Sequence, residues 1–125
     1  MSFILDTHVF FWWITDHSRL ESQHRQLIEA RGETIYVSAV TGWEIGIKVK
    51  LGKCAAVLLP GLSEKVLDEG FEVLDLTLAQ AERAGQLDLI HKDPFDRLLA
   101  AQSLLLDVPI ATVDPALAML GCNVI

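Results

Sequence analysis

Short apolar runs alternate with longer segments of helical periodicity along this chain. The short runs are rich in β-branched and aromatic residues, which favours buried strands, and the stretch from Phe71 to Leu76 alternates as a half-buried strand does. Because strands and helices alternate, we expect an α/β fold, a three-layer α/β/α sandwich with a mostly parallel central sheet. The predicted strands cover residues 3–5, 34–37, 71–76, 109–113 and 124–125.

The segments between these strands carry helix start and stop signals. Ser18 is an expected N-cap and Gly32 a stop for the second helix, while Thr77 is the expected N-cap of a short later one. The first predicted helix carries Val9, Phe10 and Trp13, and the others run from Ser18 to Gly32, Ser38 to Leu51, Pro60 to Gly70, Thr77 to Gly85, Phe95 to Leu106 and Pro115 to Leu120.

Composition narrows the class of protein. With 125 residues, about half of them apolar, the chain is expected to form a single domain, residues 1–125. No apolar run is long enough to span a bilayer, since the stretch from Phe10 to Ile14 stops at Thr15, and no cationic segment precedes Phe3, so a cytoplasmic protein without a membrane is expected. A net charge of −7 argues against a broad cationic face for nucleic acid, but not against an enzyme that uses a local metal.

The two cysteines give no sign of a metal or disulfide framework. Cys54 and Cys122 are far apart in sequence and neither has a histidine or second cysteine at a zinc-like spacing. We expect both to be small core or loop residues.

Four carboxylates lie where apolar segments end or are interrupted. Asp6 and Asp114 each follow a short predicted strand, and the carboxyl edge of a parallel sheet is where ligands bind. Glu44 falls on the apolar face of its helix, where burial requires a cation or hydrogen-bond donors nearby. The alternative for Glu44 is a position at the edge of that face, paired with Lys48 one turn later.

The Asp93-Pro94-Phe95-Asp96 segment has a structural explanation as well as a functional one. Asp93 suits an N-cap and Asp96 favours the helix dipole, where it can complete a capping-box-like arrangement. Asp96 also shares the face of the helix that packs in the core. Asp6 and Asp114 can likewise be helix caps, but caps alone do not require all four carboxylates at strand ends or on apolar faces.

If Asp6, Glu44, Asp96 and Asp114 converge, they form a metal site. Hard oxygen ligands without a thiolate or histidine cluster favour Mg²⁺ or Mn²⁺. Such a cation can polarise a phosphoryl oxygen and activate water, so phosphodiester hydrolysis is the natural chemistry.

Several motifs together resemble a known family. In order, they are Ile4-Leu5-Asp6-Thr7-His8-Val9, Ser38-Ala39-Val40-Thr41-Gly42-Trp43-Glu44-Ile45, the segment from His91 to Gln102, and Ala111-Thr112-Val113-Asp114. Their order and spacing are similar to those of PIN-domain ribonucleases, more narrowly the VapC-type toxins of type II toxin-antitoxin modules. His8 departs from the pattern, since many relatives carry asparagine there.

The resemblance implies an Mg²⁺- or Mn²⁺-dependent endoribonuclease. Asp6, Glu44, Asp96 and Asp114 would form its acidic site, with Thr112 as a helper. It also implies a homodimer that a cognate antitoxin silences by covering the active site.

Other side chains near these motifs are candidates for lesser roles. Lys48 and Arg97 are possible phosphate contacts, Asp93 a cap with a secondary role at the site, and His91 a proton carrier. Trp12 and Trp13 could stack on bases, or else belong to the core or to a dimer surface.

Two alternatives remain open at this point. A receiver-like signalling module is also an Mg²⁺-binding α/β protein of this length, but it would want an acidic pair after the first strand and a lysine after a late strand. A non-catalytic PIN-like domain that only binds partners is the second. Metal-dependent RNA cleavage separates it from a nuclease.

Overall fold

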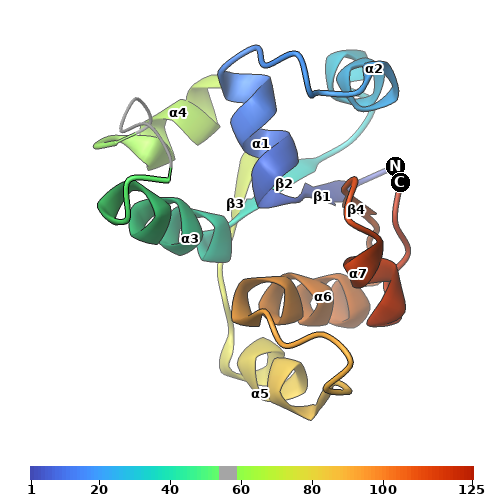
Figure 1. The fold of residues 1–125 in the computed structure, drawn as a ribbon. Helices are drawn as coiled ribbons and strands as arrows, with labels where there is room; N and C mark the ends of the chain where they lie inside the picture. Colours follow the sequence, from blue (N-terminus) through green and yellow to red (C-terminus); the bar gives the residue numbers. More distant parts are fainter. Residues whose placement is uncertain (54–58) are drawn as a thin grey trace.

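A parallel four-stranded sheet forms the centre of the computed structural model, which describes residues 1–53 and 59–125 (Figure 1). The strands are β1 (Phe3–Leu5), β2 (Ile35–Ser38), β3 (Glu72–Leu74) and β4 (Ile110–Ala111). The helices are α1 (Thr7–Ile14), α2 (Ser22–Ala30), α3 (Ala39–Lys50), α4 (Leu62–Asp68), α5 (Leu78–Gln86), α6 (Pro94–Leu106) and α7 (Pro115–Met119).

The strands are ordered β3-β2-β1-β4, so β1 lies inside the sheet. In the register, Ile4 of β1 pairs with Tyr36 on one side and with Ile110 on the other. The predicted last strand is present only as an isolated parallel bridge between Val124 and Ile110, beyond β4. All of these pairings are parallel, which confirms the predicted sheet.

Alternation along the strands divides the core into two layers. Phe3 and Leu5 belong to one buried cluster, packed with α1, α2 and α4, while Ile4 between them belongs to a second cluster, packed with α6 and α7. Figure 1 shows α5 and α6 on the opposite side of the sheet from α1 and α2. Because successive strand side chains point to opposite faces, β1 is covered on both sides, and the three-layer prediction is confirmed.

The second helix begins later than predicted. Glu21, not Ser18, occupies the N-cap position, because backbone hydrogen bonds from His17 to Trp12 and from Leu20 to His17 hold residues 17–20 in turns. The helix ends at Arg31, with a φ of 51°, rather than at Gly32. A left-handed arginine is uncommon. Its guanidinium donates to the carbonyl of Glu69 at 2.6 Å and lies over the Phe71 ring, contacts that fix this conformation.

Two other boundaries differ from the prediction for local reasons. The fourth helix begins at Leu62 with Gly61 at its N-cap, where φ is 91°, and not at Pro60. The predicted strand from Phe71 to Leu76 is reduced to β3, because it lies at the edge of the sheet and pairs only with β2. Phe71 is buried before the strand begins, whereas Glu72 and Val73 are exposed.

No helix in the described ranges is long and apolar enough to cross a membrane. Cys122 is buried, with its Sγ 3.6 Å from the carbonyl oxygen of Ala100, which confirms its place in the core. Cys54 lies outside the described residues.

Candidate active site

Asp6 lies at the carboxyl end of β1 and at the N-cap position of α1, yet its side chain makes no capping hydrogen bond. It accepts a hydrogen bond of 2.7 Å from Thr112 Oγ1 instead, and only 3% of the residue is exposed. The two residues meet because Leu5 and Ala111 are paired in the sheet immediately before them. The carboxylate is therefore held by the end of β4, the neighbouring strand, and does not cap α1.

Thr112 also positions Asp114. Its Oγ1 accepts a hydrogen bond of 2.9 Å from the Asp114 amide, so one hydroxyl joins two of the predicted acidic residues. Asp114 caps α7 as predicted, since Oδ1 accepts from the amide of Ala116 at 2.9 Å. Asp114 can therefore cap α7 and belong to the acidic group at the same time.

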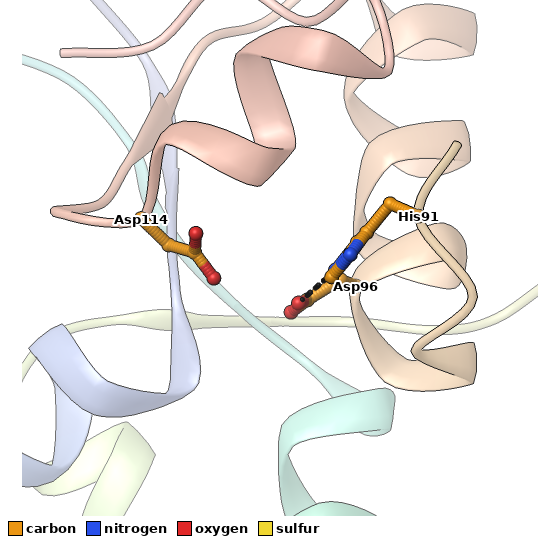
Figure 2. Close-up of side chains that lie close together, drawn as sticks. All are labelled: His91, Asp96 and Asp114. Carbon is orange, nitrogen blue, oxygen red and sulfur yellow. Dashed lines mark hydrogen bonds and ion pairs between the residues drawn. The ribbon is translucent and has the colours of Figure 1, made fainter.

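Asp96 is turned toward the sheet edge while Asp93 caps the helix. Asp93 Oδ1 accepts from the amides of Phe95 and Asp96, as predicted for an N-cap. The Asp96 carboxylate does not complete a capping box, because its Oδ2 pairs with His91 Nε2 at 2.7 Å. Figure 2 shows His91 and Asp96 joined in this way, with the Asp114 carboxylate facing them from the other side. One ligand atom of each of these three residues lies within 4.8 Å of the others.

Glu44 satisfies both expectations that the sequence left open. It is 4% exposed on α3, and Oε2 pairs with Lys48 Nζ at 2.9 Å, one turn along the helix. Oε1 is buried and has no hydrogen-bond partner among the described residues. Burying a carboxylate oxygen without a partner is costly in free energy. The salt bridge with Lys48 satisfies Oε2 but leaves Oε1 without a partner in the described part of the chain.

A pair of hydroxyls joins the elements that carry Asp6 and Glu44. Thr7 Oγ1 and Thr41 Oγ1 are 3.0 Å apart and buried, which links the first turn of α1 to the first turn of α3. Because Thr7 follows Asp6 and Thr41 precedes Glu44 by one turn of helix, this contact fixes the two carboxylates relative to each other.

The carboxyl pKa values reflect this crowding. Burial raises the pKa of Asp96 to about 6, and the negative charges of Asp93, Asp6 and Asp114 add to the rise, against the hydrogen bond from His91. Burial also raises the pKa of Asp6, and the charge of Glu44 contributes, against the hydrogen bond from Thr112. Asp6 and Glu44 are outside the closest set of three residues. The charge of Asp6 acts on Asp96, and the charge of Glu44 acts on Asp6.

Arg97 is buried and bonded within the fold, which argues against the predicted phosphate contact. It is 8% exposed, and its guanidinium donates to backbone carbonyls of the last turn of α5 and of the segment between α5 and α6. Nη1 donates to Asp88 and His91, and Nη2 to Ala84 and Leu87, at 2.7–3.1 Å. With its donors used in this way, the side chain acts as a structural clamp that holds the His91 segment over Asp96.

His91 is the residue whose importance the sequence understated. The sequence suggests only a proton carrier, yet His91 belongs to the cluster with Asp96 and Asp114. The available signal was its place five residues before Asp96, at the end of a polar connection that leads into the helix.

The donor set suits a divalent cation. Four carboxylates and an imidazole offer mostly hard oxygen ligands, the type that Mg²⁺ and Mn²⁺ prefer. A cation would also satisfy the unpartnered Glu44 oxygen and relieve the repulsion that raises the carboxyl pKa values. The residues therefore fit such an ion, with Asp6, Glu44, Asp96, Asp114 and His91 as the possible holders.

Comparison with known proteins identifies the family. The family model of the PIN domain matches residues 3–121, so the chain belongs to the PIN-domain family. PIN domains are generally nucleases. No match was found among curated proteins.

The fold is similar to three solved complexes. VapBC2 from Rickettsia felis bound to a promoter DNA fragment has 15% identity and a TM-score of 0.73, with 100% of this chain and 98% of that chain covered. FitAcB from Neisseria gonorrhoeae has 22% identity and a TM-score of 0.67, with 99% of this chain and 96% of that chain covered. A toxin-antitoxin complex from Klebsiella pneumoniae has 17% identity and a TM-score of 0.63, with 90% of this chain and 87% of that chain covered.

The receiver-like alternative does not agree with the strand order. Receiver folds have the order 2-1-3-4-5, with the third strand beside the first. Here β3 lies outside β2, and β4 takes the place beside β1. Together with the family match, this order excludes that alternative.

Proposed function

We propose that this chain is an Mg²⁺- or Mn²⁺-dependent endoribonuclease and acts in the cytoplasm as the toxin of a toxin-antitoxin module. The observation that carries the proposal is the grouping of buried Asp6 and Glu44 with half-buried Asp96 and Asp114 near one sheet edge, with an unpartnered Glu44 oxygen and a raised Asp96 pKa. Without a cation, the repulsion and burial of these carboxylates lower the stability of the fold. Their presence therefore supports a functional role as a metal site.

Asp6, Glu44, Asp96 and Asp114 would hold the ion, with His91 beside them. When bound, the ion supplies polarisation of a phosphoryl oxygen and acidification of water. Thr112 orients the Asp6 carboxylate, and Lys48 orients Glu44. His91 fixes the direction of the Asp96 carboxylate, and the Arg97 clamp keeps His91 in place.

The test is cleavage of RNA by purified protein with Mg²⁺ or Mn²⁺, and with a chelator. We expect cleavage only with metal, and its loss in Asp6→Asn and Asp96→Asn, which preserve side-chain size. Asp93→Ser, which keeps the cap, is the matched control and should cleave normally. Metal-independent cleavage, or full activity in Asp96→Asn, would contradict the proposal. Metal binding with no cleavage of any RNA would favour the non-catalytic PIN-like alternative.

The partners follow from the same proposal. We infer a cognate antitoxin protein, which the similarity to toxin-antitoxin complexes supports. We also infer a homodimer, as the family resemblance implies. Light scattering on the isolated chain measures its oligomeric state. Co-purification with the product of a small neighbouring gene, and inhibition of RNA cleavage by it, tests the antitoxin.

A further inference from the structure

A pocket of about 340 Å³ opens next to the acidic residues, between α1, the turn before α2 and α3. Basic and aromatic side chains line it, among them His8, Trp12, Arg19, Lys48 and Lys53. We call it the aromatic-basic pocket. Two of its lining residues connect it to the acidic site. Lys48 forms an ion pair with Glu44, and Thr7 directly follows Asp6 in the sequence.

The charge of this pocket is opposite to that of the chain as a whole. The net charge is −7, yet three of the ten lysines and arginines line the pocket. In the part of the chain that the structure describes, no aspartate or glutamate lines it, and no ion pair involves Arg19 or Lys53. A local positive potential beside a cluster of carboxylates suits a polyanion that must approach that cluster.

The aromatic rings that line the pocket are those of His8, Phe11 and one of two adjacent tryptophans, Trp12. Trp13 packs against the core, where its ring contacts Phe71 and its Nε1 donates a hydrogen bond of 2.9 Å to Glu69. Trp12 lines the pocket, half-buried, with His8 and His17 at ring distances of 5.8 and 6.3 Å. A flat ring in a basic pocket can stack on a nucleobase, whatever the base.

We propose that the aromatic-basic pocket binds an unpaired nucleotide of the RNA substrate, adjacent to the phosphate that lies at the carboxylates. Its base stacks on Trp12, and its phosphate contacts Arg19 and Lys53. This inference rests on the proposed ribonuclease function. It makes single-stranded or looped RNA the substrate class, because a base inside a duplex cannot enter a side pocket.

The test measures RNA binding rather than cleavage. A fluorescently labelled single-stranded RNA oligonucleotide, and a duplex of the same sequence, are titrated with full-length protein in a metal-free buffer, so that the RNA stays intact. The variants are Arg19→Gln, Lys53→Gln and Trp12→Leu. Lys50→Gln is the matched control, since Lys50 is an exposed lysine of α3 that does not line the pocket.

We expect Arg19→Gln and Lys53→Gln to weaken single-strand binding and each to reduce the slope of log affinity against log salt by about 0.7. Trp12→Leu, which keeps apolar bulk against the core, should raise Kd about fivefold or more. Lys50→Gln should bind as the wild type does, and duplex RNA should bind more weakly than the single strand.

Equal affinity of Arg19→Gln, Lys53→Gln and Lys50→Gln overturns the proposal and points to a protein segment as the occupant. Normal affinity in folded Trp12→Leu, or preference for the duplex, also overturns it. The two proposals fail separately. If the wild type cleaves RNA but the pocket variants bind it normally, only the pocket proposal fails. If the pocket variants bind RNA more weakly but the wild type cleaves none, only the ribonuclease proposal fails.

Discussion

Thr112 donates a hydrogen bond of 2.7 Å to Asp6 across a sequence separation of 106 residues. It joins the end of β4 to the end of β1, and the same hydroxyl accepts from the Asp114 amide at 2.9 Å. A single side chain therefore orients two of the proposed metal ligands.

Replacing Thr112 by valine removes this hydroxyl at nearly constant volume. We expect Thr112→Val to lower metal affinity by about 10- to 100-fold, because groups that orient metal ligands have effects of this size. Calorimetric titration with Mn²⁺ measures it. Thr112→Ser keeps the hydroxyl and should restore most of the affinity. Equal affinity in the valine and serine variants would contradict the role of the hydroxyl.

The raised pKa of Asp96 gives a pH dependence to the stability of the metal-free protein. The pKa is about 6 in the folded chain against an ordinary value of 3.8, so the folded state binds more protons between these values. The contribution of Asp96 to the free energy of unfolding therefore rises as pH falls through about 6, and is complete below about 4.

Asp96→Asn isolates that contribution. With a chelator present, we expect this variant to be more stable than the wild type above about pH 7, and the difference to disappear toward pH 4. Urea unfolding at a series of pH values measures it. Asp88→Asn, which changes an exposed aspartate, is the control. A constant difference across this range would contradict the burial argument.

Asp93 and Asp96 are expected to respond in opposite ways to substitution. Asp93→Ala removes the N-cap of α6 and should cost about 1 kcal/mol of unfolding free energy while RNA cleavage continues. Asp96→Asn should abolish cleavage without that loss of stability. Thermal unfolding and a cleavage assay on both variants check this, and loss of cleavage in folded Asp93→Ala would assign Asp93 to the site.

Arg97 is expected to matter for stability rather than for RNA. Arg97→Lys keeps the charge but cannot reproduce a planar fork bonded to several carbonyls. We expect it to lower the free energy of unfolding by about 2–4 kcal/mol, because buried acceptors lose charge-assisted partners. Arg83→Lys, at an exposed position on α5, is the matched control. RNA affinity of the folded variant should be unchanged, and a loss would restore the phosphate-contact role.

The features that the sequence predicted correctly depend on short-range chemistry. Thr77 with Gln80 forms the capping box of α5, and Asp93 and Asp114 cap α6 and α7, because a cap needs only residues two or three positions away. The continuous apolar run Phe3-Ile4-Leu5 likewise predicted a buried strand, and β1 is covered on both faces. The single-domain organisation stays a prediction.

Features that involve distant partners were not predictable in this way. The end of α2 at Arg31 depends on Glu69 and Phe71, and the commitment of Arg97 depends on where the carbonyls after α5 lie. His91 became part of the acidic group only once the connection before α6 was folded over Asp96.

By itself, the sequence determined most of the helix and strand pattern, the caps of α5, α6 and α7, and the four candidate carboxylates, because each depends on residue type and local spacing. The tertiary structure decided which carboxylates do more than cap. Asp6 turns to Thr112 and Asp96 to His91, while Asp93 remains a cap. That difference depends on burial and on partners from distant strands and helices, and these exist only after the chain has folded.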